Sequence, residues 1–239
     1  MIDSEILDKY QQPLPVSFKV IGIGEGVTDI IEKVKSFGYD CVGCFIANTP
    51  SDCTLMDDDK MVIIVARDNE DVANAIAKSY HDAGVLTIGL FHDAAPDCFD
   101  SVETDASLEK YADIIRALLQ PIVTQGYVCY DFNDLCTTLR DTRFFTTLTA
   151  EGQYIENAVT DMKNLMNNIA LKGIEYLSAH LYFNNQRLPD IKIEDLSPLT
   201  DMMSNLQESV TVIWSVNFDD TLPTDTIRFT TVMSGKGLI

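Results

Sequence analysis

Three glycines at alternate positions, in Gly22-Ile-Gly-Glu-Gly26, are the residues of this sequence best suited to hold a phosphate group. Glycine lets the backbone approach a ligand closely, and backbone N–H groups at the start of a helix attract anions. The turn follows an apolar segment that begins at Val16 and precedes a helical pattern that begins at Thr28. Strand, glycine turn and helix in this order indicate the opening of a nucleotide-binding α/β domain.

Cysteine and histidine do not indicate a metal site. Cys41 and Cys44 lie in a predicted strand, where residues three apart point to opposite faces, and no second pair has a matching spacing. His81, His92 and His180 are scattered along the chain. We therefore expect reduced thiols and no metal ligands among these residues.

Composition and net charge exclude further classes of function. The chain has 239 residues, 46% of them hydrophobic, which is enough to bury a core. Lys and Arg total 17 against 37 Asp and Glu, giving a net charge of -20 that argues against nucleic-acid binding. The acidic first residues do not resemble a signal peptide, and no apolar run approaches the roughly 20 residues of a membrane helix. We therefore expect a cytoplasmic protein without a transmembrane segment.

The elements of the first half predict a doubly wound parallel sheet. Strands are expected over 16–22, 41–47, 60–66 and 85–91, and helices over 28–36 and 70–83. The acidic run 57–59 is expected to be a solvated turn, and 93–105 a loop. A long helix from about Leu108 to Val123 would connect the two halves.

The second half predicts a smaller α+β domain with a mixed four-stranded sheet. Its expected strands are 143–149, 173–183, 209–217 and 226–233, and its helices 157–171 and 198–207. The last two strands are expected to form a hairpin around the acidic turn 219–225. The predicted domains are therefore a nucleotide-binding-type domain over 16–125, central helix included, and a C-terminal domain over 126–239.

These segments resemble the FtsZ branch of the FtsZ/tubulin superfamily over nearly the whole chain. Phe18-Lys-Val-Ile-Gly-Ile-Gly-Glu-Gly26 is similar to the family's first strand and glycine loop. Gly126-Tyr-Val-Cys-Tyr-Asp-Phe-Asn-Asp-Leu135 resembles its synergy loop, Asn-x-Asp-Phe-x-Asp, with Cys129 in place of the Asn. The segment from Trp214 to Gly235 resembles the family's closing hairpin and is the most specific match.

The resemblance implies GTP or GDP as cofactor, with Mg only alongside the nucleotide, and an FtsZ-type partner or self-association. It assigns nucleotide contacts to Gly22, Gly24, Gly26 and, by ungapped alignment, Glu109. It assigns the catalytic role to Asp131 and Asp134. In the family these acids enter the pocket of the next subunit, where carboxylates orient water or hold a cation.

One departure from the family is central. Arg67-Asp-Asn-Glu-Asp-Val-Ala73 stands where the family has its phosphate-binding Gly-Gly-Gly-Thr-Gly-[Thr/Ser]-Gly. Asp68, Glu70 and Asp71 would repel a triphosphate, whereas they suit the cap and first turn of a helix. The sequence therefore predicts a degraded GTP pocket, and it favours a role other than hydrolysis.

We accordingly predict a shortened, divergent FtsZ-like protein of cytoskeletal or cell-division type that assembles with or regulates a partner, FtsZ itself included. A reduced but active GTPase is one alternative, and a scaffold module outside filaments, such as a homodimer, is another. The glycine turn has a plainer interpretation as a tight turn between strand and helix. Asp131 and Asp134 likewise have a plainer interpretation, as the cap and the first-turn acid of a helix.

Overall fold

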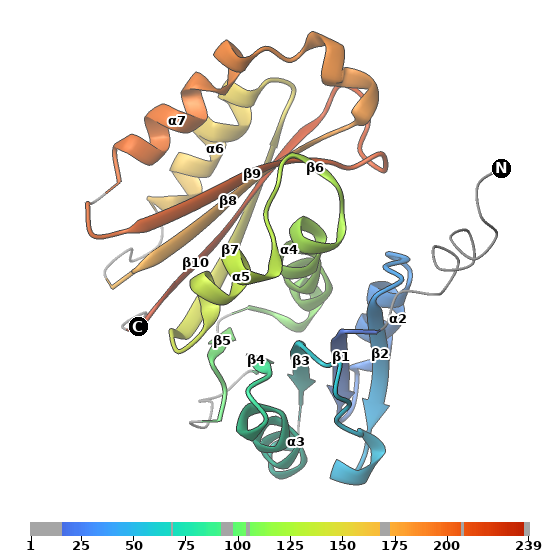
Figure 1. Cartoon of the computed structure of the whole chain (residues 1–239). Helices are drawn as coiled ribbons and strands as arrows, with labels where there is room; N and C mark the ends of the chain where they lie inside the picture. Colours follow the sequence, from blue (N-terminus) through green and yellow to red (C-terminus); the bar gives the residue numbers. More distant parts are fainter. Residues whose placement is uncertain are drawn as a thin grey trace, which may run out of the picture.

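The computed structural model describes residues 16–67, 69–91, 98–103, 106–167, 173–206 and 208–236. Within these ranges the strands form one sheet in the order β2-β1-β3-β4-β5-β7-β10-β8-β9-β6. Figure 1 shows its two parts, with the helix α4 (Tyr111–Val123) between them. Asp68 and His92 lie outside the described residues.

The first half is the predicted doubly wound parallel sheet. Its strands are β1 (Phe18–Ile23), β2 (Val42–Ala47), β3 (Met61–Ala66), β4 (Leu86–Leu90) and β5 (Ser101–Glu103). Helix α2 (Thr28–Lys35) and α4 cover one face, and α3 (Glu70–Asp82) covers the other. The predicted helix from Leu108 starts as a 3-10 turn, η2 (Leu108–Lys110), and continues as α4.

Apolar runs explain why β1 and β3 lie at the centre of this half. Both strands are buried over their whole length. Val20 and Ile63 point toward α2 and α4, whereas Ile21 and Ile64 point toward α3. A strand that is covered on both faces needs apolar residues at successive positions, and these two runs supply them.

The second half is a mixed sheet. Its elements are β6 (Gly126–Val128), α5 (Phe132–Leu139), β7 (Arg143–Gly152), α6 (Ile155–Met166), β8 (Tyr176–Phe183), η3 (Asn185–Asp190), η4 (Ile193–Leu196), α7 (Ser197–Ser204), β9 (Thr211–Phe218) and β10 (Ile227–Gly235). Strand β10 is antiparallel to β7 and β8, whereas β8 is parallel to β9. Helices α6 and α7 lie on one face, and α4 and α5 on the other (Figure 1).

The predicted closing hairpin is wrong. Strand β8 lies between β9 and β10, pairing with both, so the last two strands are not neighbours. Hairpin loops usually have two to five residues. The segment from 219 to 226 is longer and crosses over the end of β8 instead.

Other predictions need correction where tertiary contacts decide the structure. Residues 101–103 form β5 rather than a loop, and 126–128 form β6, because each segment pairs with one or two longer strands. The acidic run 57–59 is not wholly solvated. Asp59 is buried, and its Oδ2 lies 2.6 Å from Lys19 Nζ, which also donates to Tyr80 Oη at 3.2 Å.

The two halves share core as well as sheet. Ser101 and Val102 of β5 pair with Arg143 and Phe144 of β7. A cluster of buried side chains from β1, β3 and α4 also includes Leu135, from α5. The domain border at 125/126 falls between α4 and β6 and stays a prediction. No helix within the described ranges is both long and apolar enough to span a membrane.

Candidate nucleotide turn and acidic loop

The glycine turn directly follows β1, at the carboxyl edge of the parallel strands. Gly24 has φ of +94° and Gly26 of +75°, a region that favours glycine. A Cβ atom on Gly24 would lie 1.6 Å from the carbonyl oxygen of Arg67. The Arg67 N–H donates to the Ile23 carbonyl at 3.0 Å. Gly24 is therefore the residue that lets the segment after β3 cross the turn in close contact.

Two helices begin beside this turn, and each has acids in its first turn. Helix α2 has Asp29 there, and α3 has Glu70 and Asp71. Neither helix has a side-chain cap on its N-terminal N–H groups. The positive ends of both helix dipoles therefore face carboxylates of the chain itself.

One positive group and one predicted contact also lie at the turn. The Arg67 Nη1 would be 3.5 Å from a Cβ on Gly26, and the Leu108 side chain 3.6 Å from it. Glu109 follows Leu108 in η2 and is exposed. The structure thus brings Gly26 and the η2 turn that carries Glu109 close together.

Asp131 and Asp134 form the start of α5. Asp131 Oδ1 accepts hydrogen bonds from the N–H groups of Asn133, at 2.7 Å, and Asp134, at 3.1 Å. The Asp131 N–H donates to Asp134 Oδ2 at 2.9 Å, which completes a capping box. Asp131 is exposed and Asp134 half-buried. The box uses one oxygen of each carboxylate, so the geometry includes the cap that the plainer interpretation predicts.

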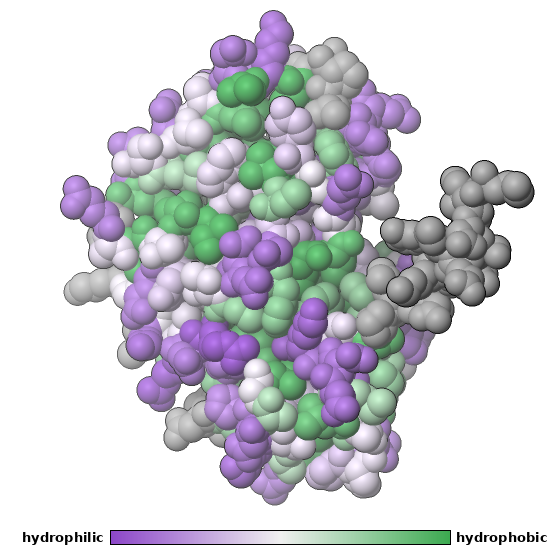
Figure 2. All heavy atoms as spheres, in the orientation of Figure 1, coloured by the Kyte–Doolittle hydropathy of each residue, from purple (hydrophilic) through white to green (hydrophobic). Residues whose placement is uncertain are grey.

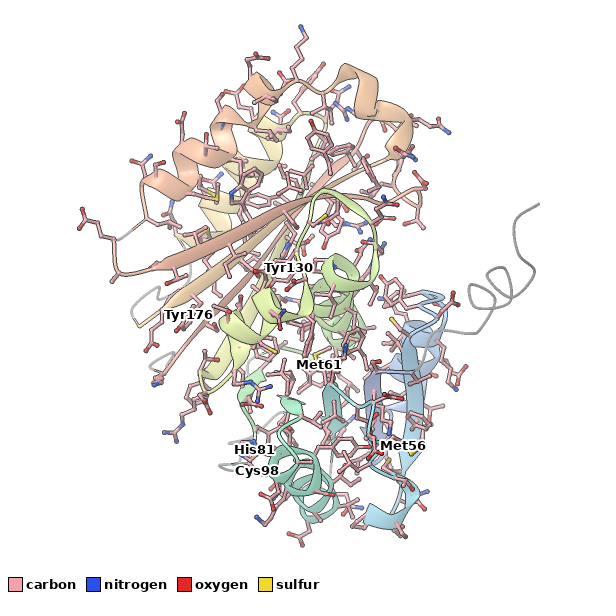
Figure 3. All side chains as sticks on the ribbon, in the orientation of Figure 1. Met56, Met61, His81, Cys98, Tyr130 and Tyr176 are labelled. Carbon is pink, nitrogen blue, oxygen red and sulfur yellow. The ribbon has the colours of Figure 1, made fainter. Side chains whose placement is uncertain are left out.

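The acidic loop and the glycine turn lie at opposite edges of the sheet. Phe132, beside Asp131, has its ring 5.5 Å from that of Phe18, the first residue of β1. Strand β1 is six residues long and Gly24 directly follows its last residue, and a strand rises about 3.3 Å per residue. Figure 3 labels Tyr130, the residue before Asp131, above Met61, the first residue of β3. The chain therefore does not bring its own acids to its own glycine turn.

The amino-acid sequence gives little indication of a buried polar group beneath the acidic loop. His180 of β8 is fully buried and lies 2.7 Å from Ser215 Oγ and 3.0 Å from Ser178 Oγ. Burial lowers the pKa of His180 to about 3, so the ring is neutral near pH 7. Its ring meets that of Tyr130 edge to face, with centroids 4.6 Å apart. The only signal in the sequence is polar residues at alternating positions of two strands.

A second buried polar group connects the central helix to the last strands. Asp219 is buried, and its Oδ2 accepts from Arg116 at 2.6 Å, Gln120 at 2.9 Å and Arg228 at 3.1 Å. Burial raises the pKa of Asp219, but hydrogen bonds from Thr221 and Gln120 and the charge of Arg116 outweigh it and lower the pKa overall. A cavity of about 230 Å³ lies beside this group.

The visible face of the molecule carries both polar and apolar residues (Figure 2). Figure 2 shows hydrophilic residues over both halves of the visible face, with hydrophobic residues between them. Among the described residues, no three or more His, Cys, Asp or Glu side chains are grouped so that they could hold a metal ion.

No protein-family model and no curated protein matches the sequence. The structure is similar to FtsZ of M. jannaschii, solved as an empty dimer, with a TM-score of 0.71 and 14% identity over 98% of this chain and 92% of that one. It is also similar to TubZ of Bacillus thuringiensis serovar israelensis in GDP-form protofilaments, with a TM-score of 0.59 and 9% identity over 92% and 84%. TubZ of Clostridium botulinum phage c-st gives 0.53 and 10% over 93% of each chain. The fold is therefore FtsZ/tubulin-like, and the low identity makes the sequence a divergent one.

Proposed function

We propose that this protein is a divergent FtsZ-like protein of cytoskeletal or cell-division type whose own GTP site is degraded. It assembles with a partner of the same fold, FtsZ itself being the first candidate, and presents its acidic loop to that partner. In this role it regulates the partner's filament rather than hydrolysing GTP in its own pocket. Similar structures have been solved as a dimer of FtsZ and as protofilaments of TubZ, which makes end-to-end contact a reasonable starting point.

The observation that carries the degraded site is the contact between Gly24 and Arg67. The space that a Cβ would take on Gly24 is filled by the Arg67 carbonyl oxygen, which is a hydrogen-bond acceptor. A phosphate needs donors at this place, and it would meet an acceptor and the carboxylates of Glu70 and Asp71. These residues do not fit a triphosphate.

The position of the acids supports action on another chain. Because Asp131 and the glycine turn lie at opposite edges of the sheet, the acids reach a nucleotide only if it belongs to a second subunit. One oxygen of the exposed Asp131 carboxylate takes no part in the capping box. Such an oxygen is suited to orient water or hold a hard cation in a partner's pocket.

The test is to mix the chain with a GTP-polymerising FtsZ from the same cell and to measure GTP turnover and light scattering. We expect the chain to change both, and Asp131→Asn to lose the effect on turnover, because Asn keeps the helix cap but not the charge. Ile193→Lys, at an exposed site in η4, is the control for a surface change outside the loop. If neither readout responds to the native chain, the proposal is wrong.

A second candidate function rests on Arg67. Its guanidinium lies beside Gly26 and places a positive charge at the turn, which is favourable for an anion. This favours a reduced GTP-binding protein. Calorimetric titration with GTP and magnesium separates the two candidates. Binding tighter than about 10 μM, roughly 7 kcal/mol, would support the second and contradict the degraded site.

A further inference from the structure

We infer that His180 is a positioning residue for Asp131. It lies at the centre of a row of four buried side chains, which we call the polar row: Ser178, His180, Ser215 and Asn217. This inference rests on the proposed function, in which Asp131 is the group presented to the partner.

The polar row is continuous across two strands. His180 of β8 is opposite Ser215 of β9 in the parallel register. Asn217 Nδ2 donates to Ser215 Oγ at 2.6 Å, and the His180 ring joins Ser215 Oγ at 2.7 Å to Ser178 Oγ at 3.0 Å. All four side chains are fully buried. Burying polar groups is unfavourable unless they are hydrogen-bonded, so the row has one preferred arrangement rather than many.

One direction of donation fits all three bonds. Asn217 donates to Ser215, the Ser215 hydroxyl donates to His180 Nδ1, and His180 Nε2–H donates to Ser178 Oγ. This assignment requires a neutral imidazole, with one nitrogen as acceptor and the other as donor. Desolvation keeps the pKa of His180 low and so favours that form.

The polar row contacts the segment from 126 to 130, which precedes Asp131, at both ends of that segment. Tyr130, the residue directly before Asp131, is buried and presents its ring edge to face against His180 at 4.6 Å and 80°. At the other end, a Cβ on Gly126 would lie 2.6 Å from Asn217 Oδ1. The segment from 126 to 130 therefore contacts the polar row at its first and last residues, and the next residue is Asp131.

The helix after the loop is held by the same sheet. Tyr130 Oη lies 3.3 Å from Thr138 Oγ1, and the Thr138 carbonyl accepts a hydrogen bond from Ser234 Oγ of β10. With the loop fixed from below by His180 and the helix fixed by Ser234, the direction of the Asp131 carboxylate is set by the second half of the molecule. Removing the His180 ring takes away the edge-to-face contact under Tyr130, and we expect this to free the loop.

The experiment compares His180→Ala with Met162→Ala by amide hydrogen exchange. Met162 is buried in α6, on the other face of the same sheet, so its variant destabilises the sheet without touching the polar row. The probes are the amides of Asn133 and Asp134, which Asp131 caps. We expect His180→Ala to speed their exchange about tenfold more than Met162→Ala does, because the loop opens locally. Tyr130→Phe keeps the ring against His180 and removes only the contact of its hydroxyl with Thr138, so its exchange should rise less than that of His180→Ala.

The outcomes separate the positioning role from the proposed function. Equal exchange of these amides in His180→Ala and Met162→Ala would overturn the positioning role, whatever the partner does. Faster exchange together with loss of the Asp131-dependent effect on FtsZ turnover supports both. A third outcome is faster exchange in His180→Ala while the native chain and Asp131→Asn both leave FtsZ turnover unchanged. That result supports the positioning role and overturns the proposed function.

Discussion

At the scale of single residues, Gly24 shows why the turn needs glycine. Its φ of +94° disfavours a side chain, and its contact with the Arg67 carbonyl leaves no space for one. Gly38 also has a positive φ, +70°, but a Cβ there would meet nothing within 4 Å. The two glycines therefore separate backbone strain from steric overlap.

We expect Gly38→Ala to lower the free energy of unfolding by about 1 kcal/mol, the cost of the left-handed conformation. Gly24→Ala should lower it by at least about 3 kcal/mol, because overlap with the Arg67 backbone adds to that strain. Urea unfolding of both variants measures the difference. Equal losses would show that the segment after β3 moves aside easily, which would also weaken the case for a filled phosphate site.

Burial of His180 makes the free energy of unfolding depend on pH. Burial holds its pKa near 3 in the folded chain, against about 6.5 when unfolded. Below pH 6.5 the unfolded chain binds a proton that the folded chain does not, so stability falls as pH falls, by up to about 1.4 kcal/mol per pH unit. The rings facing His180 are Tyr130 and Tyr182, whose pKa values are raised by burial and which stay neutral in this range.

His180→Gln should therefore show a shallower fall in the free energy of unfolding between pH 6.5 and 5 than the native chain. Urea titrations at several pH values in that window provide the comparison. Parallel slopes for the two proteins would mean that His180 is protonated in the folded state.

At the scale of elements, α5 shows how one pair of acids can serve a helix and a partner at once. The capping box satisfies N–H groups that have no partner within the helix. Asp131→Ala should lower the free energy of unfolding by about 1 kcal/mol, and Asp131→Asn by only a few tenths, because Asn also caps. Urea unfolding checks both values. If Asn costs as much as Ala, the charge rather than the cap stabilises α5.

At the scale of the whole molecule, Asp219 ties the central helix to the second half. Asp219→Ala leaves Arg116 and Arg228 beside a site without its carboxylate. We expect a loss of about 3 kcal/mol in the free energy of unfolding, at the low end for buried pairs because both guanidinium groups partly reach solvent. Lys33→Ala removes the exposed pair with Asp113 and should cost less than about 1 kcal/mol. Similar losses in the two variants would mean that the Asp219 group adds little to the joining of the halves.

Features that depend on neighbours along the chain follow directly from the amino-acid sequence. The apolar runs of β1 and β3 set a two-sided core, the glycines set the turn, and Asp131 with Asp134 set the start of α5. Local spacing is sufficient for these, because each follows from the period of a strand, a turn conformation or a helix cap.

Which distant segments meet, in contrast, depends on contacts that form in the folded chain. The short strand β5 exists because β4 and β7 pair with it, and β9 and β10 are separated because β8 lies between them. The polar row and the Asp219 group likewise join side chains that are 35 and 103 positions apart, as in His180 with Ser215 and Arg116 with Asp219. No periodicity in the sequence encodes such pairs, since their free energy arises only when burial removes both partners from water.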